Sequence, residues 1–396
     1  MFGFLRQAGT ISLLNLRNLP QRVGPTLVAV AGFAGVVLVF VGVFSIREGF
    51  RRTLESGGSP EVAVVLRGGA RSEMASVLTR EDVRVVSQAP GIARGPSGPV
   101  VSPEVLVLLD VARRSTGLGA NAPFRGVLPA AFELRDEVRI VAGRTFKPGL
   151  DEVIVGIKAA EQFRGLGIGN RIDSGRHHWL VTGHFAAGGG LVESEIWTDA
   201  RVLQQAYGRG PNFQVAYARL PSAAAFPAFR DRLMHDPRLD VTVQRESEFL
   251  ASQSEILSTF ITVAGGAIAL LMGIGAIFGA INTMYITVAA RSRELATLRA
   301  IGFGRAPVLA AVLAEGLVLG LAGGLAGGAV AYLVFNGFQA STLNFQSFSQ
   351  VSFTFAVTPT LLVSGVQAAL LMGVLGGLLP GIRAARMPIA RALREL

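Results

Sequence analysis

Four long apolar stretches constrain this chain more than any other feature. Each contains an uninterrupted apolar run of about 20 residues, the length of helix that crosses a bilayer core about 30 Å thick. The composition agrees, because the mean hydropathy is +0.47 and 16% of residues are charged, where a soluble domain carries about 25%. We therefore expect a membrane protein with four transmembrane helices, at residues 23–47, 254–288, 306–335 and 357–380.

Positive charge is concentrated beside these stretches. Residues 48–253 hold 25 of the 37 basic and 23 of the 27 acidic residues, which leaves 12 basic and 4 acidic residues for the rest. Apart from Arg47 at the end of the first stretch, the arginines outside 48–253 precede the first stretch, separate the second from the third, and follow the fourth, so the positive-inside rule makes these segments cytosolic. The same distribution excludes a nucleic-acid partner, because such binders gather positive charge on a soluble face.

An even number of spans places both termini in the cytosol and one long segment outside, between the first and second spans. The expected order is a cytosolic interfacial helix at 1–22, the first span at 23–47, the outer domain at 48–253, the second span at 254–288, a cytosolic helix at 289–305, the third span at 306–335, a short outer loop at 336–356, the fourth span at 357–380 and a cytosolic tail at 381–396.

The outer segment alternates short β-rich runs with helix-like runs, which predicts an α+β domain. Thr79, with Asp82 three residues later, predicts a capped helix start, and Ser222 predicts another. Glu193 and Glu195 fit either a surface contact or a polar hairpin beside a buried tryptophan, and the hairpin is favoured. No histidine has metal-ligand spacing and no serine lies in a nucleophile motif, so we predict neither a catalytic residue nor a metal site.

The sequence contains no nucleotide-binding motif. A P-loop requires Gly-Lys-Ser/Thr, because backbone amides cradle the phosphates while the lysine reaches the β and γ oxygens. The two lysines of the chain follow Phe146 and Ile157, and neither completes that motif. We therefore expect no cofactor in this chain, and any ATP and Mg²⁺ to be bound by a partner.

The segment after the second span carries the most specific motif, which reads R-S-R-E-L-A-T-L-R-A-I-G over residues 291–302. On a helix, the apolar residues at every third position from Leu295 to Ile301 form one stripe, while Glu294 and the arginines face polar partners. Gly302 then ends the helix. An ordinary amphipathic interfacial helix is the simpler interpretation.

This motif resembles the cytosolic coupling segment of the MacB/FtsX/LolC-type ABC transporter permeases. The Glu315-Gly316 start of the third span and the tail at 379–393 are similar to the same family, and patches at 165–169 and 193–197 resemble its MacB-type periplasmic domain. The resemblance implies that the following residues couple the chain to an ATPase: Arg291, Arg293, Glu294, Leu295, Leu298, Arg299, Ile301 and Gly302.

The resemblance further implies the membrane subunit of an ABC transporter in the bacterial inner membrane, with the large domain in the periplasm and two copies of a separate ATPase subunit. The expected activity is export, efflux or extraction of a periplasmic or outer-leaflet substrate, such as a lipoprotein, a lipid or a hydrophobic compound. A periplasmic adaptor or a lipoprotein is a further expected partner. The alternatives are an FtsX-like regulator that activates a periplasmic cell-wall hydrolase and a membrane-anchored sensor with no ATPase.

Small residues at four-residue spacing in the third span let helix backbones approach closely in lipid. We expect them to pack against a second copy of the chain or a paralogous permease, with packing inside the chain as the alternative. These residues are Gly316, Gly320, Gly323, Gly324, Gly327 and Gly328. Glu315 beside them is expected at the cytosolic edge of the membrane, as a structural anchor rather than a proton relay.

Overall fold

The computed structural model describes residues 23–55, 58–96, 98–174, 177–343 and 350–388, together with Gly9. These residues form two compact units. The helical unit comprises the described parts of Met1–Gly49, Thr259–Phe338 and Phe355–Leu396, and the α+β unit comprises those of Phe50–Ser258 and Gln339–Thr354. The predicted interfacial helix at 1–22 and the last eight residues of the tail lie outside the described residues, Gly9 excepted.

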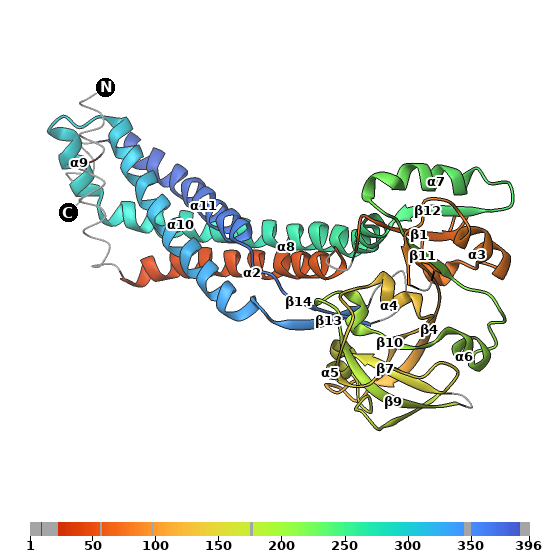
Figure 1. Ribbon diagram of the computed structural model, residues 1–396. Coiled ribbons are helices and arrows are strands. Elements are labelled where there is room, and N and C mark those ends of the chain that lie inside the picture. The colour runs from red at the N-terminus through yellow and green to blue at the C-terminus, as the bar shows by residue number, and fades with distance from the viewer. Residues whose placement is uncertain are drawn as a thin grey trace. The chain divides into compact units, whose positions relative to one another are not determined.

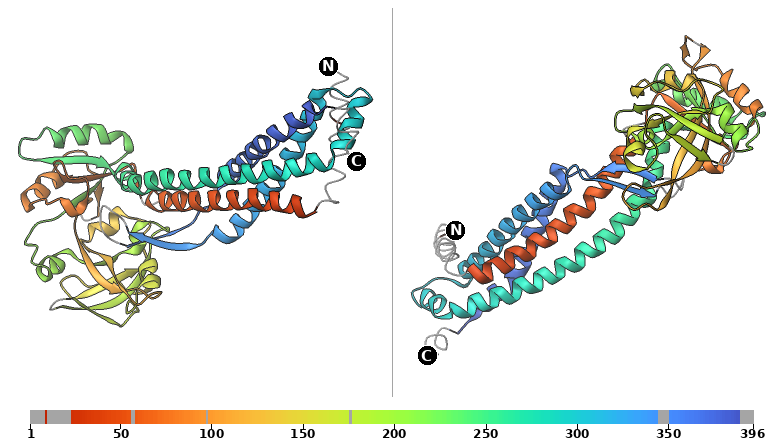
Figure 2. Two further views of the ribbon diagram at one scale, coloured as in Figure 1. Left: turned by 180° about the vertical axis from the view of Figure 1, so that it is seen from behind. Right: turned by 90° about the horizontal axis from the view of Figure 1, so that it is seen from below.

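The helical unit is built on four long helices, each apolar and long enough to cross a membrane (Figure 1). They are α2 (Val23–Glu55), α8 (Glu246–Ala290), α10 (Arg305–Phe335) and α11 (Pro359–Arg386). Within this unit the helices run side by side, as both views in Figure 2 show, and share one apolar core that includes Phe33, Met284 and Met372. Thr358 is the N-cap of α11, and its hydroxyl accepts a hydrogen bond from the backbone N–H of Leu361.

All four helices are longer than the roughly 20 residues that a bilayer core requires, and α8 is the longest. At 1.5 Å per residue the 45 residues of α8 extend about 67 Å, more than twice the hydrocarbon thickness. The boundary between the two units falls inside α8, between Ser258 and Thr259, and inside α2, between Gly49 and Phe50. The first turns of α8 and the last turn of α2 therefore belong to the α+β unit.

The α+β unit is organised around one mixed, ten-stranded sheet with the strand order β12-β1-β11-β4-β5-β10-β7-β9-β6, in which β8 also pairs with β9. The strands are β1 (Val62–Arg67), β4 (Val101–Ala112), β5 (Gly119–Val127), β6 (Arg139–Gly143), β7 (Glu152–Gly156), β8 (Arg171–Ser174), β9 (His177–Ala186), β10 (Ile196–Asp199), β11 (Val215–Arg219) and β12 (Val241–Arg245). The long antiparallel pair β4–β5 joins its two halves.

Short helices cover this sheet and add to its apolar cores. They are α3 (Arg80–Ser87), α4 (Ala130–Leu134), α5 (Ile157–Gln162), α6 (Ala200–Ala206) and α7 (Phe226–Met234), with 3₁₀ turns at Glu73–Ala75 (η2), Leu191–Ser194 (η3) and Ala223–Ala225 (η4). The predicted capping box of α3 is confirmed, because Thr79 and Asp82 bond reciprocally to each other's backbone N–H. The predicted helix start at Ser222 is confirmed in position, because Ser222 is the N-cap of η4 and η4 runs directly into α7, although its side chain makes no cap hydrogen bond.

The segment predicted as a short outer loop forms a β-hairpin, β13 (Gln339–Leu343) with β14 (Gln350–Thr354), and this hairpin belongs to the α+β unit. Val351 and Phe353 alternate inward and are buried, and the Phe353 ring meets Phe50 edge-on at 5.5 Å. The Ser352 hydroxyl donates to the Gln162 side chain at 2.7 Å. The alternation of apolar and polar residues from Val351 to Thr354 is too short to predict a strand without the α+β unit against which it packs.

Candidate functional site

The predicted coupling motif forms its own helix between α8 and α10, labelled α9 (Ser292–Ala300) in Figure 1. Gly302 ends it with a φ of +105°, a left-handed conformation that only glycine adopts without strain. The N–H of Phe303 bonds to the carbonyl of Leu298, and the N–H of Gly302 bonds to that of Arg299. This is the Schellman arrangement, which fixes where the chain turns into α10.

One face of α9 is packed against the helical core. Leu295 and Ala296 are buried, and half-buried Leu298 packs against the apolar core of the helical unit. The predicted apolar stripe is wrong at its last position, because Ile301 is 69% exposed. Ile301 occupies the C-cap, where the backbone leaves helical geometry, so its side chain departs from the line of the stripe.

The charged residues of the motif have two different roles. Arg291 is buried at the N-cap and pairs with Glu294 at 2.9 Å, and Arg299 donates to the backbone carbonyl of Met387 after α11. Arg383 of α11 also stacks over the Tyr285 ring of α8 at 5.5 Å. The Arg299 hydrogen bond fastens α9 to the end of α11, whereas the Arg291–Glu294 pair lies within the first turn of α9.

The opposite face of α9 is exposed. It presents Arg293, Glu294, Thr297, Ala300 and Ile301. Ile301 is thus the large aliphatic side chain of a face that is otherwise charged, polar or small. The motif therefore combines one face that packs against the helical core with one that is exposed.

All six predicted glycines of α10 are buried, and their contacts lie inside the chain. A Cβ on Gly316 would lie 2.3 Å from the carbonyl oxygen of Gly373 in α11, and one on Gly320 would lie 2.5 Å from that of Ala369. A Cβ on Gly327 would lie 2.4 Å from the carbonyl oxygen of Ala34 in α2. Gly323 likewise faces α2, and Gly324 and Gly328 face α11. The packing expected between two copies is thus packing within one chain, and these glycines give no argument for a dimer.

Glu315 is half-buried and lies well inside α10, because this helix begins ten residues earlier, at Arg305. That offset corresponds to about 15 Å along the helix axis. The span expected at 306–335 nearly coincides with α10, and the apolar run without a charge begins after Glu315, at Gly316.

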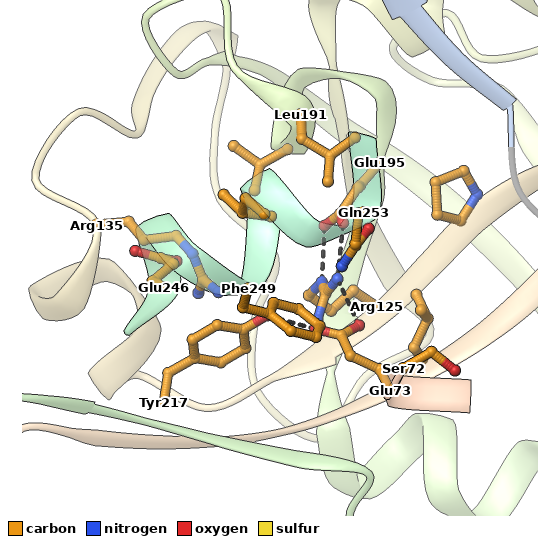
Figure 3. A pocket seen from close by; sticks show the side chains of 14 residues that line it. Ser72, Glu73, Arg125, Arg135, Leu191, Glu195, Tyr217, Glu246, Phe249 and Gln253 are labelled. Carbon is orange, nitrogen blue, oxygen red and sulfur yellow. Dashed lines mark hydrogen bonds and ion pairs between the residues drawn. The ribbon is translucent and has the colours of Figure 1, made fainter. Parts of the chain in front are cut away.

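A buried ionic cluster, which sequence reasoning missed, lies in the α+β unit (Figure 3). Arg125 of β5 contacts three carboxylates, those of Glu73 at 3.0 Å, Glu104 at 3.0 Å and Glu195 at 2.8 Å. Arg135 forms a second pair with Glu104 at 2.6 Å. All five side chains are buried. Burial by itself raises the pKa of Glu104, but Arg135 and Arg125 outweigh it, so that the pKa is lowered and the carboxylate stays charged.

This cluster borders a cavity of about 40 Å³ whose lining includes Arg125, Arg135, Tyr217 and Glu246. A space of this size holds one or two water molecules. The cavity is therefore too small for a lipid or a drug-sized ligand. The sequence signal that was available is a charge within a largely apolar strand, as at Glu104 in β4 and Arg125 in β5.

Glu193 and Glu195 are buried, so the surface interpretation is wrong, and the hairpin interpretation is wrong as well, because β7 separates β9 from β10 in the sheet. Both are buried beside fully buried Trp197. Glu193 accepts the backbone N–H groups of Ala187 and Gly189 at 2.7 and 2.9 Å, and Glu195 accepts the indole N–H of Trp197 at 2.7 Å. These carboxylates therefore hold the loop before β10 in place.

Two family models match the chain. The FtsX-like permease C-terminal model matches residues 266–389, and the MacB-like periplasmic core domain model matches residues 26–235. Among solved structures, the extracellular domain of the noncanonic ABC-type transporter YknZ from Gram-positive bacteria is 16% identical, with a TM-score of 0.33, over 46% of this chain and 100% of that one. The periplasmic region of MacB from Actinobacillus actinomycetemcomitans is 12% identical, with a TM-score of 0.37, over 49% of this chain and 92% of that one. No curated protein sequence matches significantly.

Proposed function

Because this chain belongs to the family of MacB- and FtsX-type ABC transporter permeases, we propose that it couples ATP hydrolysis by a separate ATPase subunit to movement of its α+β unit. The observation that carries this proposal is the two-faced α9. Its inner face is fixed through Leu295 and Arg299 to the membrane helices, and its outer face presents Arg293 and Ile301. A force applied to the outer face therefore acts on α8, α10 and α11 together.

Chain continuity supports transmission to the α+β unit. Helices α2 and α8 each continue without a break across the boundary between the units. Helices α10 and α11 connect to the same unit through the two strands of the β13–β14 hairpin. Every long helix thus has a direct covalent route to the domain that would move.

The proposed topology has four spans, both termini and α9 in the cytosol, and the α+β unit in the periplasm of a bacterial inner membrane. It is supported by the excess of arginine at the α9 end of the helices. Two ATPase copies would supply ATP and Mg²⁺ sites, since no P-loop occurs in this sequence. A second copy or a paralogous permease would cover α8, whose apolar residues Phe260, Leu271 and Phe278 are exposed.

The proposed action is export, efflux or extraction of a substrate that already lies in the periplasm or outer leaflet, of the lipoprotein, lipid or hydrophobic-compound class. The cavity of about 40 Å³ beside the ionic cluster is too small to enclose such a substrate. A regulator that activates a cell-wall hydrolase would use the same coupling helix and differ in its outer partner.

The test is co-purification of the tagged chain in mild detergent with Ile301→Asp as the variant. The charge removes an exposed apolar contact without disturbing the core, so the ATPase is expected to be lost while expression and membrane insertion are kept. Met234→Asp, at a half-exposed apolar position in α7, is the matched control and should retain the ATPase. Undiminished ATPase binding by Ile301→Asp would contradict the proposed role of this face. A periplasmic adaptor or lipoprotein that co-purifies would favour the transporter, whereas a cell-wall hydrolase would favour the regulator.

A further inference from the structure

The α+β unit contains a contact that joins the chain segment after α2 to the first turn of α8. Glu246 is the first residue of α8, and its Oε2 accepts the backbone N–H of Ser59 at 3.0 Å. A Cβ on Gly58 would lie 2.8 Å from the Cα of Ser247, so the two segments touch backbone to backbone. Arg245 adds a hydrogen bond to the carbonyl of Pro60 at 2.8 Å. We call this contact the 58–60/246 junction.

Glu246 is 6% exposed and borders the buried ionic cluster. Figure 3 shows its side chain next to Arg135. Arg135 is already engaged by Glu104, and Arg125 is engaged by Glu73, Glu104 and Glu195. Among the described residues, no lysine or arginine nitrogen lies within 4.0 Å of the Glu246 carboxyl, and its hydrogen bond comes from Ser59.

The charge balance of this region is unfavourable for a fourth carboxylate. Four buried glutamates, namely Glu73, Glu104, Glu195 and Glu246, face two buried arginines. A buried carboxylate without an ion-pair partner is costly in free energy and takes up a proton instead. Glu104 and Glu137 add further negative charge around Glu246, and Arg135 supplies the opposing positive charge.

We propose that Glu246 is a proton-binding site whose occupancy keeps the 58–60/246 junction closed, so that the pH outside the membrane sets how firmly α2 and α8 are joined inside the α+β unit. A protonated Glu246 keeps an acceptor oxygen for the Ser59 N–H and carries no buried charge. An ionised Glu246 keeps the hydrogen bond but becomes an excess negative charge beside Glu104. The regulatory meaning rests on the function proposed above, because this junction links the two helices that continue into the α+β unit.

The direction of the pH effect follows from the electrostatics. Burial, more than any other factor, raises the pKa of Glu246 from 4.5 to about 7, against the lowering effects of Arg135 and the Ser59 N–H. Glu246 lies outside the membrane-spanning segment, since the apolar run of α8 begins eleven residues later, at Leu257. Because the pKa of Glu246 is higher in the closed junction than in an open one, proton binding stabilises the closed junction. This stabilisation is complete below the ordinary pKa of 4.5 and is lost as the pH rises toward 7.

Hydrogen–deuterium exchange of the full-length chain in nanodiscs tests the proposal. Peptides that cover Ser59 and the first turn of α8 are followed from pH 5 to pH 8.5, after correction for the intrinsic pH dependence of amide exchange. Protection in these peptides is expected to fall by up to about tenfold per pH unit between pH 5 and pH 7 and to level off above pH 7. Glu246→Gln, which is neutral at every pH and keeps the acceptor oxygen, is expected to remove this dependence and hold the high protection seen at pH 5.

Glu248→Gln is the matched control, because Glu248 lies two residues further on and its side chain is 62% exposed beside Arg245. It should leave the pH dependence unchanged. Constant protection of the wild-type peptides from pH 5 to pH 7 would overturn the proposal whatever the variants do, as would an unchanged pH dependence in Glu246→Gln. No ATPase takes part in this measurement, so its failure is distinct from failure of the coupling function.

Discussion

The two units of the molecule are stabilised in opposite ways. In the helical unit, glycines of α10 bring backbones together, as where a Cβ on Gly316 would meet the Gly373 carbonyl at 2.3 Å. In the α+β unit, a sheet core encloses Arg125 among three carboxylates. The difference follows from what surrounds each unit. Lipid provides no hydrophobic driving force between helices, so close backbone contact holds them together. In the α+β unit, charges that are buried away from water must be paired.

The largest expected effect comes from filling a backbone contact in the helical unit. Gly316→Leu places a side chain where the Gly373 carbonyl lies, so α10 and α11 must separate, and we expect loss of the monodisperse chain in size-exclusion chromatography. Gly275→Leu is the control, because no atom lies within 4 Å of the position of its Cβ. Equal yields of the two variants would show that the glycine contacts do not hold this unit together.

The next effect concerns the ionic cluster. Arg125→Met leaves Glu73 and Glu195 buried without their guanidinium partner, and we expect the α+β unit to lose about 3–5 kcal/mol of unfolding free energy. Both tryptophans of the chain, Trp179 and Trp197, are fully buried in this unit. Urea unfolding followed by tryptophan fluorescence therefore reports on it alone.

Arg84→Met is the control for this measurement. Arg84 forms an exposed pair with Glu81 at 2.6 Å, and exposed pairs contribute about 0–1 kcal/mol. If Arg125→Met proves as mild as Arg84→Met, the cluster does not stabilise the unit and the contrast with the helical unit fails.

The smallest expected effect tests the hairpin. Ser352→Ala removes the hydrogen bond to Gln162, and we expect a loss of about 1 kcal/mol in the tryptophan-monitored unfolding of the α+β unit. Thr354→Ala, at an exposed position of the same strand, should change it less. A hairpin that is independent of the α+β unit would give no change for either variant.

The four long helices and the end of α9 could be predicted from the sequence, because an apolar run and a helix-ending glycine are both local features. What the glycines pack against was not readable. The same spacing suits contact with α2, α11 or a second copy, and only the fold shows that Gly316 meets Gly373.

The α+β unit was less predictable because its contacts join distant residues. Arg125 bonds to Glu73 and Glu195, which lie 52 and 70 positions away in the chain, so the local sequence marks a charge within an apolar strand but does not identify its partners. Residues 336–356 contain no charge, and nine of the 21 are apolar, but the burial of Val351 and Phe353 follows from a partner surface that the local sequence does not reveal. Ile301 departed from its predicted stripe because the helix ends there.

The most direct test of the proposed ATPase contact is site-specific crosslinking from α9. Single cysteines can be introduced because the chain contains none. Cysteine is introduced singly at Arg293 and Ile301 on the exposed face, and at buried Leu295 as the control, and each variant is crosslinked in native membranes. We expect an ATPase adduct from positions 293 and 301 and none from position 295. Absence of an ATPase adduct from both exposed positions would contradict the claim that this face receives the ATPase.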